Sequence, residues 1–442
     1  MTGIFKGNDI RGIYNKDLNK DISKKIGYVF DKSYKKSVLL LGYDNRLSSK
    51  SLKQAFIYGI KSKIIDLGMV PTPLFYYALD HIPNSKGVMI TASHLPKEFN
   101  GFKLQISSFP LTYSSGIKDI ENKVKHINKV KKTNKIIIKR NLNKSYINYL
   151  VSKVKIKRKL NIALDAGNGV GALILLPVLK KLKIKVTPIY CNPDGNYPNH
   201  VADPIIDKNL KDLQNLVVKN KLDFGIALDG DADRMKIVSP KGKIIESEIL
   251  ASLLLKHLNP KNKKVIYSAI CSDVIRDVAK TLGAKPVIEK VGHSFIKNTA
   301  LKQRAIMTVE YTGHMGFKEN NYNDDGIFAA IKTCEVVSRD SDFWQKEEAL
   351  SNIYKLSHEL RFKASDKLKQ KIISKLKSKF KNKKQLKLDG LKIYFDKSSW
   401  ALVRPSLTED KISIRFQAKT KKQLDKISKF VLSDIKNTHN TI

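Results

Sequence analysis

The chain has 442 residues, of which 42% are apolar, and its formal net charge is +42. No apolar run approaches the roughly 18 residues that a membrane-spanning helix needs, and the opening residues MTGIFKGNDIRG lack the apolar core of a signal peptide. We therefore expect a cytoplasmic protein without a membrane partner. The cysteines Cys191, Cys271 and Cys334 have neither metal-ligand spacing nor a disulfide framework, so we expect reduced thiols.

The positive charge comes from lysines scattered along the whole chain. Only 11 of the 83 basic residues are arginine. The lysine-rich stretches at 125–140 and 367–384 lack the interleaved aromatic residues of a single-strand binding platform. We interpret the charge as a lysine bias of the surface and expect no specific nucleic-acid partner. A positive field would still help to gather small anionic substrates.

In chain order, six continuous apolar runs predict strands that are buried on both faces, as in parallel sheets. They span 37–44, 63–73, 86–93, 160–169, 222–230 and 265–270. Several end in Gly, Asp or Ser, which is typical of strands that deliver functional loops at their carboxyl ends. The fold class that this pattern indicates is α/β, with several similar domains in series.

From about residue 391 the pattern changes to a smaller α+β unit. Short strands are expected at 391–396, 400–406 and 411–418, and a closing helix at 421–435. A lysine-rich helical linker at 365–385 is expected to precede them.

Three aspartates follow the strand expected at 222–230. Asp229, Asp231 and Asp233 alternate within LDGDADRM, which places three carboxylates in one tight turn. Such a set of oxygens suits a hard divalent cation such as Mg²⁺, and Arg234 and Pro240 exclude an EF-hand because they replace its required Gly and Glu. The alternative is a set of turn and cap aspartates, but close carboxylates repel one another unless a cation offsets their charge.

Ser93 ends the run at 86–93, within VMITASHLPKEFNGFK. The sequence T-A-S-H-L lacks the G-x-S-x-G elbow of α/β-hydrolases. In an extended segment Ser93 and His94 would point to opposite faces, which makes His94 a poor base for Ser93. Ser93 could be a cap or turn serine. Beside a magnesium loop it could instead carry a phosphoryl group, whose charge Arg234 and Lys103 would help to offset.

The segment RPSLTEDKISIRF, residues 404–416, gathers two guanidinium groups and two hydroxyls. They belong to Arg404, Ser406, Thr408 and Arg415. Arginine binds phosphate oxygens in a bidentate manner, which lysine does not. The pattern indicates either a phosphate cradle or a turn at a strand edge, and the use of arginine in a lysine-biased chain favours the cradle.

The chain resembles the α-D-phosphohexomutase superfamily, and it is most similar to the bacterial phosphomannomutase/phosphoglucomutase branch. Besides the three loops above, the resemblance rests on eight motifs in family order: GNDIRG (7–12), GYDNRLSS (42–49), DLGMVPTP (66–73), DAGNGVG (165–171), NPDGNYPNH (192–200), KVGHSFIK (290–297), EYTGH (310–314) and NDDGIFAA (323–330). It implies four domains around a central cleft, three similar α/β domains and a smaller C-terminal α+β domain. We place them at 1–140 (phosphoserine loop), 141–242 (metal loop), 243–352 (sugar-recognition loop) and 353–442 (phosphate loop).

The resemblance implies that a phosphoryl group moves between the 1- and 6-hydroxyls of mannose, glucose or both. The route would be a phosphoserine enzyme and a hexose 1,6-bisphosphate, which also acts as activator. Ser93 matches the family's phosphoserine and would join the three aspartates around Mg²⁺. His94, Lys103 and His293 would handle protons, and Arg234 would complete the catalytic set. The implied substrate-binding residues are Arg11, Glu310, Thr312, His314, Arg404, Ser406, Thr408 and Arg415.

Six positions depart from the family branch. Asn8, Leu95, Ile270, Val309, Thr312 and Leu407 stand where Tyr, Asn, Lys, Gly, Ser and Asn are usual. Leu95 and Leu407 each remove a side-chain hydrogen bond of about 1 kcal/mol or more to a charged group, and Ile270 removes a phosphate contact. None replaces the serine, the aspartates, Arg234 or Lys103, so we expect the chemistry to survive with weaker phosphate anchoring or an altered substrate preference.

Three alternatives remain open from the sequence. A phosphoglucosamine mutase shares the serine and metal loops but differs at EYTGH, and a sugar-phosphate phosphatase would have to admit water to the phosphoenzyme. A basic nucleic-acid-binding protein on a catalytically retired mutase scaffold belongs to another class. The sequence does not choose between mannose, glucose and glucosamine, and it sets no oligomeric state, although we expect a monomer.

Overall fold

The computed structural model describes residues 3–7, 9–406 and 410–439. The chain forms two compact units. The N-terminal unit consists of Met1–Glu246 and Thr312–Ser341, and the C-terminal unit of Ser247–Tyr311 and Asp342–Ile442. Within the described residues, no helix is long and apolar enough to cross a membrane.

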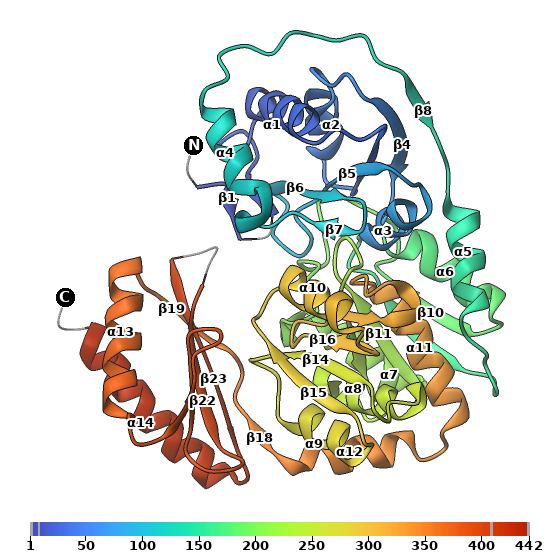
Figure 1. Ribbon diagram of the computed structural model, residues 1–442. Coiled ribbons are helices and arrows are strands. Elements are labelled where there is room, and N and C mark those ends of the chain that lie inside the picture. Colours follow the sequence, from blue (N-terminus) through green and yellow to red (C-terminus); the bar gives the residue numbers. More distant parts are fainter. Residues whose placement is uncertain (1–2, 8, 407–409, 440–442) are drawn as a thin grey trace. The chain divides into compact units, whose positions relative to one another are not determined.

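An eight-stranded sheet begins the N-terminal unit (Figure 1). Its strands, in spatial order, are β1 (Phe5–Lys6), β2 (Asp9–Ile13), β6 (Phe99–Ile106), β5 (Ser85–Ile90), β3 (Val38–Tyr43), β4 (Lys63–Met69) and β8 (Ile137–Lys139), and β7 (Phe109–Pro110) pairs with β6. Strands β5, β3, β4 and β8 run parallel, while β6 is antiparallel to β5. Every residue of β5 is buried, as expected from its continuous apolar sequence.

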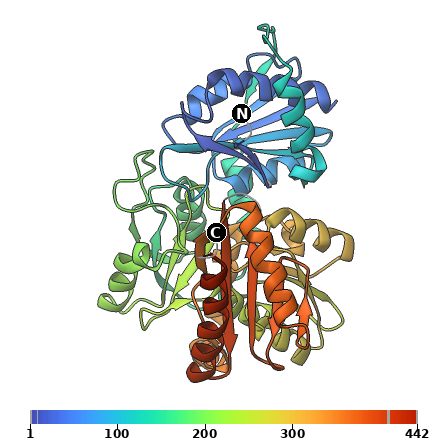
Figure 2. The ribbon, with the colours of Figure 1, turned by 90° about the vertical axis from the view of Figure 1, so that its left-hand side faces the viewer.

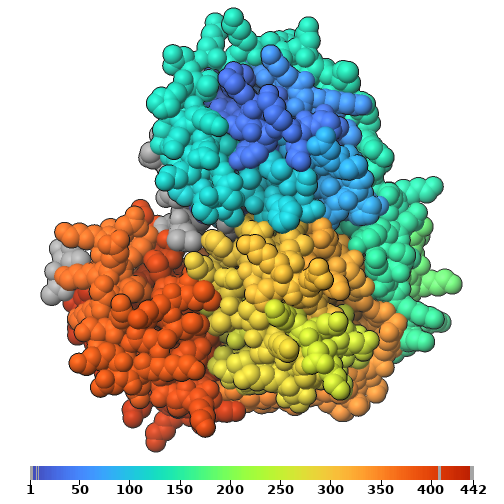
Figure 3. Space-filling view, in the orientation of Figure 1, coloured from blue at the N-terminus to red at the C-terminus, as the bar shows by residue number. Residues whose placement is uncertain are grey.

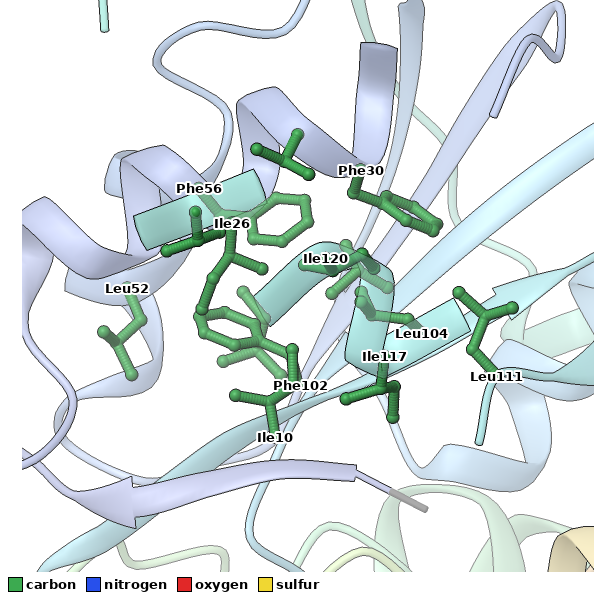
Figure 4. Packing of buried hydrophobic residues seen from close by; sticks show 14 of the residues in the cluster. Ile10, Ile26, Phe30, Leu52, Phe56, Phe102, Leu104, Leu111, Ile117 and Ile120 are labelled. Atoms are coloured by element: carbon green, nitrogen blue, oxygen red, sulfur yellow. The ribbon is translucent and has the colours of Figure 1, made fainter. Parts of the chain in front are cut away.

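Helices cover both faces of this sheet. Helices α1 (Lys20–Ser33), α2 (Ser49–Phe56) and α4 (Lys118–Lys125) lie on one face, α4 following a π-helical turn at Tyr113–Ile117, and α3 (Thr72–His81) lies on the other (Figure 1). The side chain of Asn19 caps α1 by accepting a hydrogen bond from Ile22 N. Phe30, Phe56 and Phe102 join aliphatic side chains of all three helices in one core (Figure 4).

A second sheet completes the N-terminal unit. Its strands, in spatial order, are β10 (Lys185–Ile189), β9 (Asn161–Asp165), β11 (Phe224–Leu228), β12 (Met235–Val238) and β13 (Ile244–Ile245). The first three are parallel and the last two antiparallel. The remaining elements of this unit are α5 (Asn143–Ser152), α6 (Ala172–Lys181), a 3₁₀ turn (Asp207–Leu210), α7 (Lys211–Lys219), β17 (Met315–Phe317), a 3₁₀ turn (Lys318–Asn320) and α11 (Gly326–Arg339).

The C-terminal unit also begins with parallel strands. Strand β14 (Lys264–Ser268) lies between β15 (Lys285–Glu289) and β16 (Met307–Val309), parallel to both. The helical elements around them are α8 (Ser247–Leu255), a 3₁₀ turn (Lys256–Leu258), α9 (Val274–Thr281), α10 (His293–Gln303) and α12 (Phe343–Ile353). The three cysteines, Cys191, Cys271 and Cys334, are free, and the last two are buried.

The chain ends in an antiparallel sheet with two helices. In spatial order its strands are β18 (Lys355–Leu356), β23 (Lys411–Ala418), β22 (Trp400–Pro405), β21 (Leu391–Tyr394) and β20 (Lys384–Leu386), and β19 (Leu360–Lys363) pairs with β23. Helices α13 (Asp366–Lys379) and α14 (Lys421–His439) lie side by side on one face (Figures 1 and 2). In Figure 3 the side chains of this orange-to-red segment pack into one continuous body. The expected α/β class with a smaller α+β end is confirmed.

Helix α13 corrects the expectation of a linker at 365–385. Leu368, Ile372 and Leu376 recur every four residues and are buried in the core of the last sheet. The lysines between them hid this apolar stripe in the sequence, because long charged side chains can flank a buried face. The segment is therefore part of the C-terminal domain.

The core of the first sheet gives a stability prediction. Phe102→Ala should lower the free energy of unfolding by about 3–5 kcal/mol, because Phe102 is fully buried and its removal leaves a cavity. Phe109→Ala is the matched control, since Phe109 lies close by in sequence but is 54% exposed. Urea unfolding of both variants would test this, and equal losses would contradict the packing described here.

Candidate active site

In the N-terminal unit the loop after β5 meets the loop between β11 and β12. The side chain of Ser93 is buried, and its Oγ donates a hydrogen bond to Asp229 Oδ2 at 2.6 Å. The loops also touch through their backbones, because a Cβ added to Gly230 would lie 2.7 Å from Ser93 O. Only glycine at this position lets the two loops approach so closely.

Ser93 has a left-handed backbone conformation with φ of +53°. For a residue other than glycine such a conformation costs about 1–3 kcal/mol, and it persists only where its surroundings hold it. Ser93 N donates to Thr91 Oγ1 at 2.8 Å, and Ser93 O accepts a hydrogen bond from Arg46 Nη2 at 2.7 Å. The serine is thus fixed at its amide, its carbonyl and its hydroxyl.

This turn corrects the expectation about His94. Strand β5 ends at Ile90, so Ser93 and His94 are not in an extended segment. The left-handed turn brings Ser93 Oγ to 3.1 Å from His94 Nδ1. Burial, followed by the nearby charges of Arg234 and Arg11, holds the pKa of His94 well below its ordinary value. A neutral imidazole therefore lies beside the hydroxyl.

The three aspartates form a compact cluster. Each offers a carboxylate oxygen within 4.8 Å of the others, and all three side chains are buried. Lys103 from β6 forms salt bridges with Asp233 and, at 2.9 Å, with Asp231. Thr72 Oγ1, at the start of α3, donates to Asp231 Oδ2 at 2.6 Å.

Electrostatic repulsion within the cluster is large. At an effective dielectric constant of about 20, two carboxylates about 5 Å apart repel by about 3 kcal/mol. Burial, and then the charges of Asp233 and Asp231, raise the pKa of Asp229 well above its ordinary value. Burial also opposes ionisation of Asp233, but Lys103 and His314 outweigh it and hold the pKa of Asp233 well below its usual range.

The cluster has the chemistry of a metal site. Buried carboxylate oxygens are the ligands that hard divalent cations prefer. Among the described residues no group hydrogen-bonds Asp231 Oδ1, although this atom is buried. Lys103 forms salt bridges with two of the three carboxylates, Asp231 and Asp233. The three aspartates could therefore hold a metal ion.

Four further expected residues lie in the same unit. Arg11 Nη2 donates to Asp9 Oδ2 at 2.6 Å, and its Nη1 is 3.5 Å from Ala92 O, next to Ser93. Arg234 Nε lies 3.2 Å from His314 Nε2, which in turn lies 3.4 Å from Asp233 Oδ1.

Thr312 Oγ1 lies 3.0 Å from His314 Nδ1. The structure thus brings residues of the serine, metal and EYTGH motifs together within the N-terminal unit.

The C-terminal unit holds a second group of expected site residues. Glu310 Oε2 accepts a hydrogen bond from Gly292 N, immediately before His293. Asp389 Oδ2 accepts hydrogen bonds from Val291 N at 3.1 Å and from Arg404 Nε at 3.0 Å. Asp389 therefore joins the arginine of the expected phosphate loop to the loop that carries His293.

The position of the Arg415 side chain does not suit a direct contact with phosphate. Its side chain is fully buried, stacked on the ring of Tyr311, and its Nη1 donates to Glu248 Oε1 and to Ile270 O, both at 2.9 Å. Ser406 N donates to Lys411 O at 2.9 Å, which pairs the residue after β22 with the start of β23. Within the described part of this loop, Arg404 is the half-buried guanidinium.

Of the six positions that depart from the family branch, four lie within the described residues and two lie outside them. Ile270 and Val309 are buried, and Leu95 O accepts a hydrogen bond from Arg46. Thr312 contacts His314, as described above. Asn8, Leu407 and the expected phosphate contact Thr408 lie outside the described residues.

Sequence reasoning missed three residues that shape these groups: Arg46, Thr72 and Asp389. Arg46 and Thr72 lie in motifs on which the resemblance rested, and Arg46 is also one of only 11 arginines in a lysine-biased chain. These facts are signals that could have identified both residues. Asp389 precedes a glycine in a turn, and nothing in its sequence context distinguishes it.

Comparisons with known proteins decide the family. Family models for phosphoglucomutase/phosphomannomutase alpha/beta/alpha domains I, II and III match residues 2–131, 144–242 and 246–359. A phosphoglucomutase of Neisseria gonorrhoeae is 32% identical over 440 residues, which cover 96% of this chain and 95% of that protein. The chain belongs to the phosphoglucomutase/phosphomannomutase family. The resemblance to the phosphohexomutase superfamily is thus confirmed.

Other members of the family give the same picture. A phosphomannomutase/phosphoglucomutase of Pseudomonas syringae is 31% identical over 98% of this chain and 95% of its own length. A crystal structure of a phosphoglucomutase/phosphomannomutase family protein from Burkholderia thailandensis matches with a TM-score of 0.91 at 26% identity, covering 99% of this chain and 98% of that one. These matches favour the mutase interpretation over the nucleic-acid-binding alternative.

The carboxylate cluster gives a binding prediction. Asp231→Asn should weaken the binding of Mg²⁺ or Mn²⁺ by about tenfold or more, because it removes a charged oxygen from the cluster. Asp66→Asn is the matched control, since Asp66 is also buried and paired with a lysine, Lys53, but lies outside the cluster. Calorimetric titration would measure both, and unchanged affinity in Asp231→Asn would show that the cation binds elsewhere.

Proposed function

We propose that this protein is a phosphohexomutase, an isomerase that interconverts the 1-phosphate and 6-phosphate of mannose, glucose or both. The observation that carries the proposal is the buried, strained Ser93, whose Oγ lies 2.6 Å from an oxygen of a three-aspartate cluster. Relatives over the full length that are named phosphoglucomutase and phosphomannomutase/phosphoglucomutase support it.

In this reaction Ser93 carries the phosphoryl group. A sugar hydroxyl attacks the phosphorus, the bond from phosphorus to Ser93 Oγ breaks, and hexose 1,6-bisphosphate forms. The sugar hydroxyl loses its proton, and Ser93 Oγ regains one. The bisphosphate then returns its other phosphoryl group to Ser93, and free bisphosphate serves as the activator that phosphorylates the resting enzyme.

We assign proton handling to the groups around the serine and the sugar. His94 is next to Ser93 Oγ and neutral, so it can accept or return the serine proton. Burial alone would lower the pKa of Lys103, but the charges of Asp231 and Asp233 outweigh burial and raise it. Lys103 therefore acts chiefly as a fixed positive charge. His293 is the corresponding candidate in the C-terminal unit, and Arg234 would stabilise the transferred phosphoryl group.

The metal of the proposal is Mg²⁺, held by Asp229, Asp231, Asp233 and the phosphorylated Ser93. When bound, it would offset the charge of the phosphoryl oxygens. The Asp residues would keep their carboxylates directed at one point, because Lys103 and Thr72 fix two of the side chains.

Substrate recognition is assigned to two sets of residues. Glu310, Thr312 and His314 would hydrogen-bond sugar hydroxyls in either orientation of the sugar. The residues proposed for phosphate are Arg11, Arg404, Ser406, Thr408 and Arg415. Among these, Arg415 would act indirectly, through the Glu248, Ile270 and Tyr311 groups that its fully buried guanidinium contacts.

The proposal also includes the domain limits given above, with boundaries after residues 140, 242 and 352. It further includes a cytoplasmic location and a monomer. Size-exclusion chromatography with light scattering would test the last point.

Removing the serine hydroxyl gives the first functional prediction. Ser93→Ala should lower mutase turnover by about 10⁴-fold or more with an unchanged fold, because the phosphoryl carrier is lost. Ser85→Ala is the matched control: Ser85 is a buried serine of the preceding strand whose hydroxyl donates to Ile82 O. A coupled assay with glucose 1-phosphate, mannose 1-phosphate and glucosamine 6-phosphate would measure turnover and define the sugar. Near-normal turnover in Ser93→Ala would disprove the proposal.

The phosphate loop gives the second functional prediction. Arg404→Lys should raise KM by about 10–100-fold, because lysine keeps the charge but loses the bidentate geometry of a bond worth about 1.5–3 kcal/mol. Arg158→Lys, which alters an exposed salt bridge with Asp223 in the N-terminal unit, should leave KM unchanged. If KM is the same in both variants, the distal phosphate binds elsewhere.

A further inference from the structure

The guanidinium of Arg46 is buried beneath the loop that carries Ser93. Its Nη2 donates to Ser93 O at 2.7 Å and to Leu95 O at 2.6 Å. Its Nη1 donates to Pro96 O at 2.7 Å and to Phe99 O at 2.9 Å.

The fifth N–H of the same group is also used. Nε donates to Asp44 Oδ2 at 3.1 Å, so all five N–H groups of Arg46 have acceptors. Asp44 is held in turn by Ser49 Oγ at 2.6 Å and by the backbone N of Arg46. The ring of Tyr197 lies 5.3 Å from the centre of the guanidinium. Arg46 thus has a single orientation, with its planar fork directed at four main-chain carbonyls.

These carbonyls belong to the segment that sets the direction of the Ser93 side chain. The left-handed Ser93 is unfavourable by itself, so its geometry depends on groups that grip the loop on either side. Arg46 binds the carbonyl of Ser93 itself and three carbonyls after it. Without Arg46, the buried carbonyl of Ser93 and the partly buried carbonyls after it would lose a charged hydrogen-bond donor. The turn could then relax toward an ordinary conformation that moves Oγ away from Asp229.

We propose that Arg46 is a positioning residue for phosphoryl transfer: by binding the carbonyls of residues 93, 95, 96 and 99, it keeps Ser93 Oγ directed at the aspartate cluster. The inference rests on the proposed function, because it assumes that Ser93 carries the phosphoryl group. All five N–H groups of Arg46 are occupied by Asp44 and main-chain carbonyls, which leaves none for a substrate or for Ser93 Oγ. The effect of Arg46 should therefore appear in kcat, with little change in KM.

The test compares Arg46→Lys with a buried lysine at the opposite end of β5. A lysine ammonium cannot reach four carbonyls in a plane, so Arg46→Lys should lower kcat by about 100-fold, which is the scale of a misplacement of about 1 Å. KM should stay within about threefold of the wild-type value. The control is Lys86→Met, which removes a buried cation bound to Asp31 and to Tyr34 O. It should lower the melting temperature while leaving kcat within about threefold of wild type.

A second measurement needs no enzyme assay. In Arg46→Lys the amides of Leu95 and Phe99, which bond to Ala92 O and Pro96 O, should exchange with deuterium at least about tenfold faster. In Lys86→Met they should not. If Arg46→Lys does not fold, Asp44→Asn decides by the same two criteria, because it weakens the contact that orients Nε.

The outcomes separate the inference from the proposed function. A wild-type protein without mutase activity would overturn the proposed function. Faster deuterium exchange of the Leu95 and Phe99 amides in Arg46→Lys would still support the role of Arg46 in holding the Ser93 loop. An active wild type with unchanged kcat in Arg46→Lys would overturn the inference alone. A loss of kcat that Lys86→Met shares would also overturn it, because the effect would then be general destabilisation.

Discussion

The contact between the Ser93 turn and the aspartate loop is the constraint on which the N-terminal unit depends. A hydroxyl and three carboxylates are buried together, although carboxylates repel one another and the serine backbone is strained. Neither loop could hold this arrangement alone. Gly230 lets the backbones approach to van der Waals distance, and Lys103 from β6 supplies a charge that binds two of the three carboxylates. The cost in free energy is localised where a bound cation would offset the repulsion between the carboxylates.

The two sheets of the N-terminal unit supply the parts in a regular way. Strands β5 and β11 are buried on both faces, and each ends at one of the two loops that meet. The buried strands therefore fix the positions of the first residues of both loops. The loops themselves are fixed by side chains that bind main-chain atoms, chiefly Arg46 and Thr91 around Ser93. In the C-terminal unit Asp389 has the same role, because it joins Arg404 to the loop that precedes α10. Both units thus use buried charged groups to order loops.

Much of this could be predicted from the sequence, and the exceptions have physical reasons. Continuous apolar runs predicted the parallel strands, and the spacing of Asp229, Asp231 and Asp233 predicted the cluster, because all three carboxylates come from one turn. The left-handed conformation of Ser93 could not be predicted, since it depends on partners distant in the chain, and so the relation of His94 to Ser93 was predicted wrongly. Arg46 binds four main-chain carbonyls, and Asp389 joins one main-chain N–H to Arg404, so neither role follows from a spacing of side chains in the sequence. Helix α13 was mistaken for a linker because its lysines outnumber the three residues of its apolar stripe.

The central claim is that Ser93 receives a phosphoryl group beside the aspartate cluster. The most direct measurement is mass spectrometry of peptides after incubation with glucose 1,6-bisphosphate and Mg²⁺, with and without chelator. The account predicts one phosphorylated peptide, with the phosphate on Ser93, formed rapidly only when the cation is present. Phosphate on a different residue, or equal labelling of Ser93 in excess chelator, would contradict it.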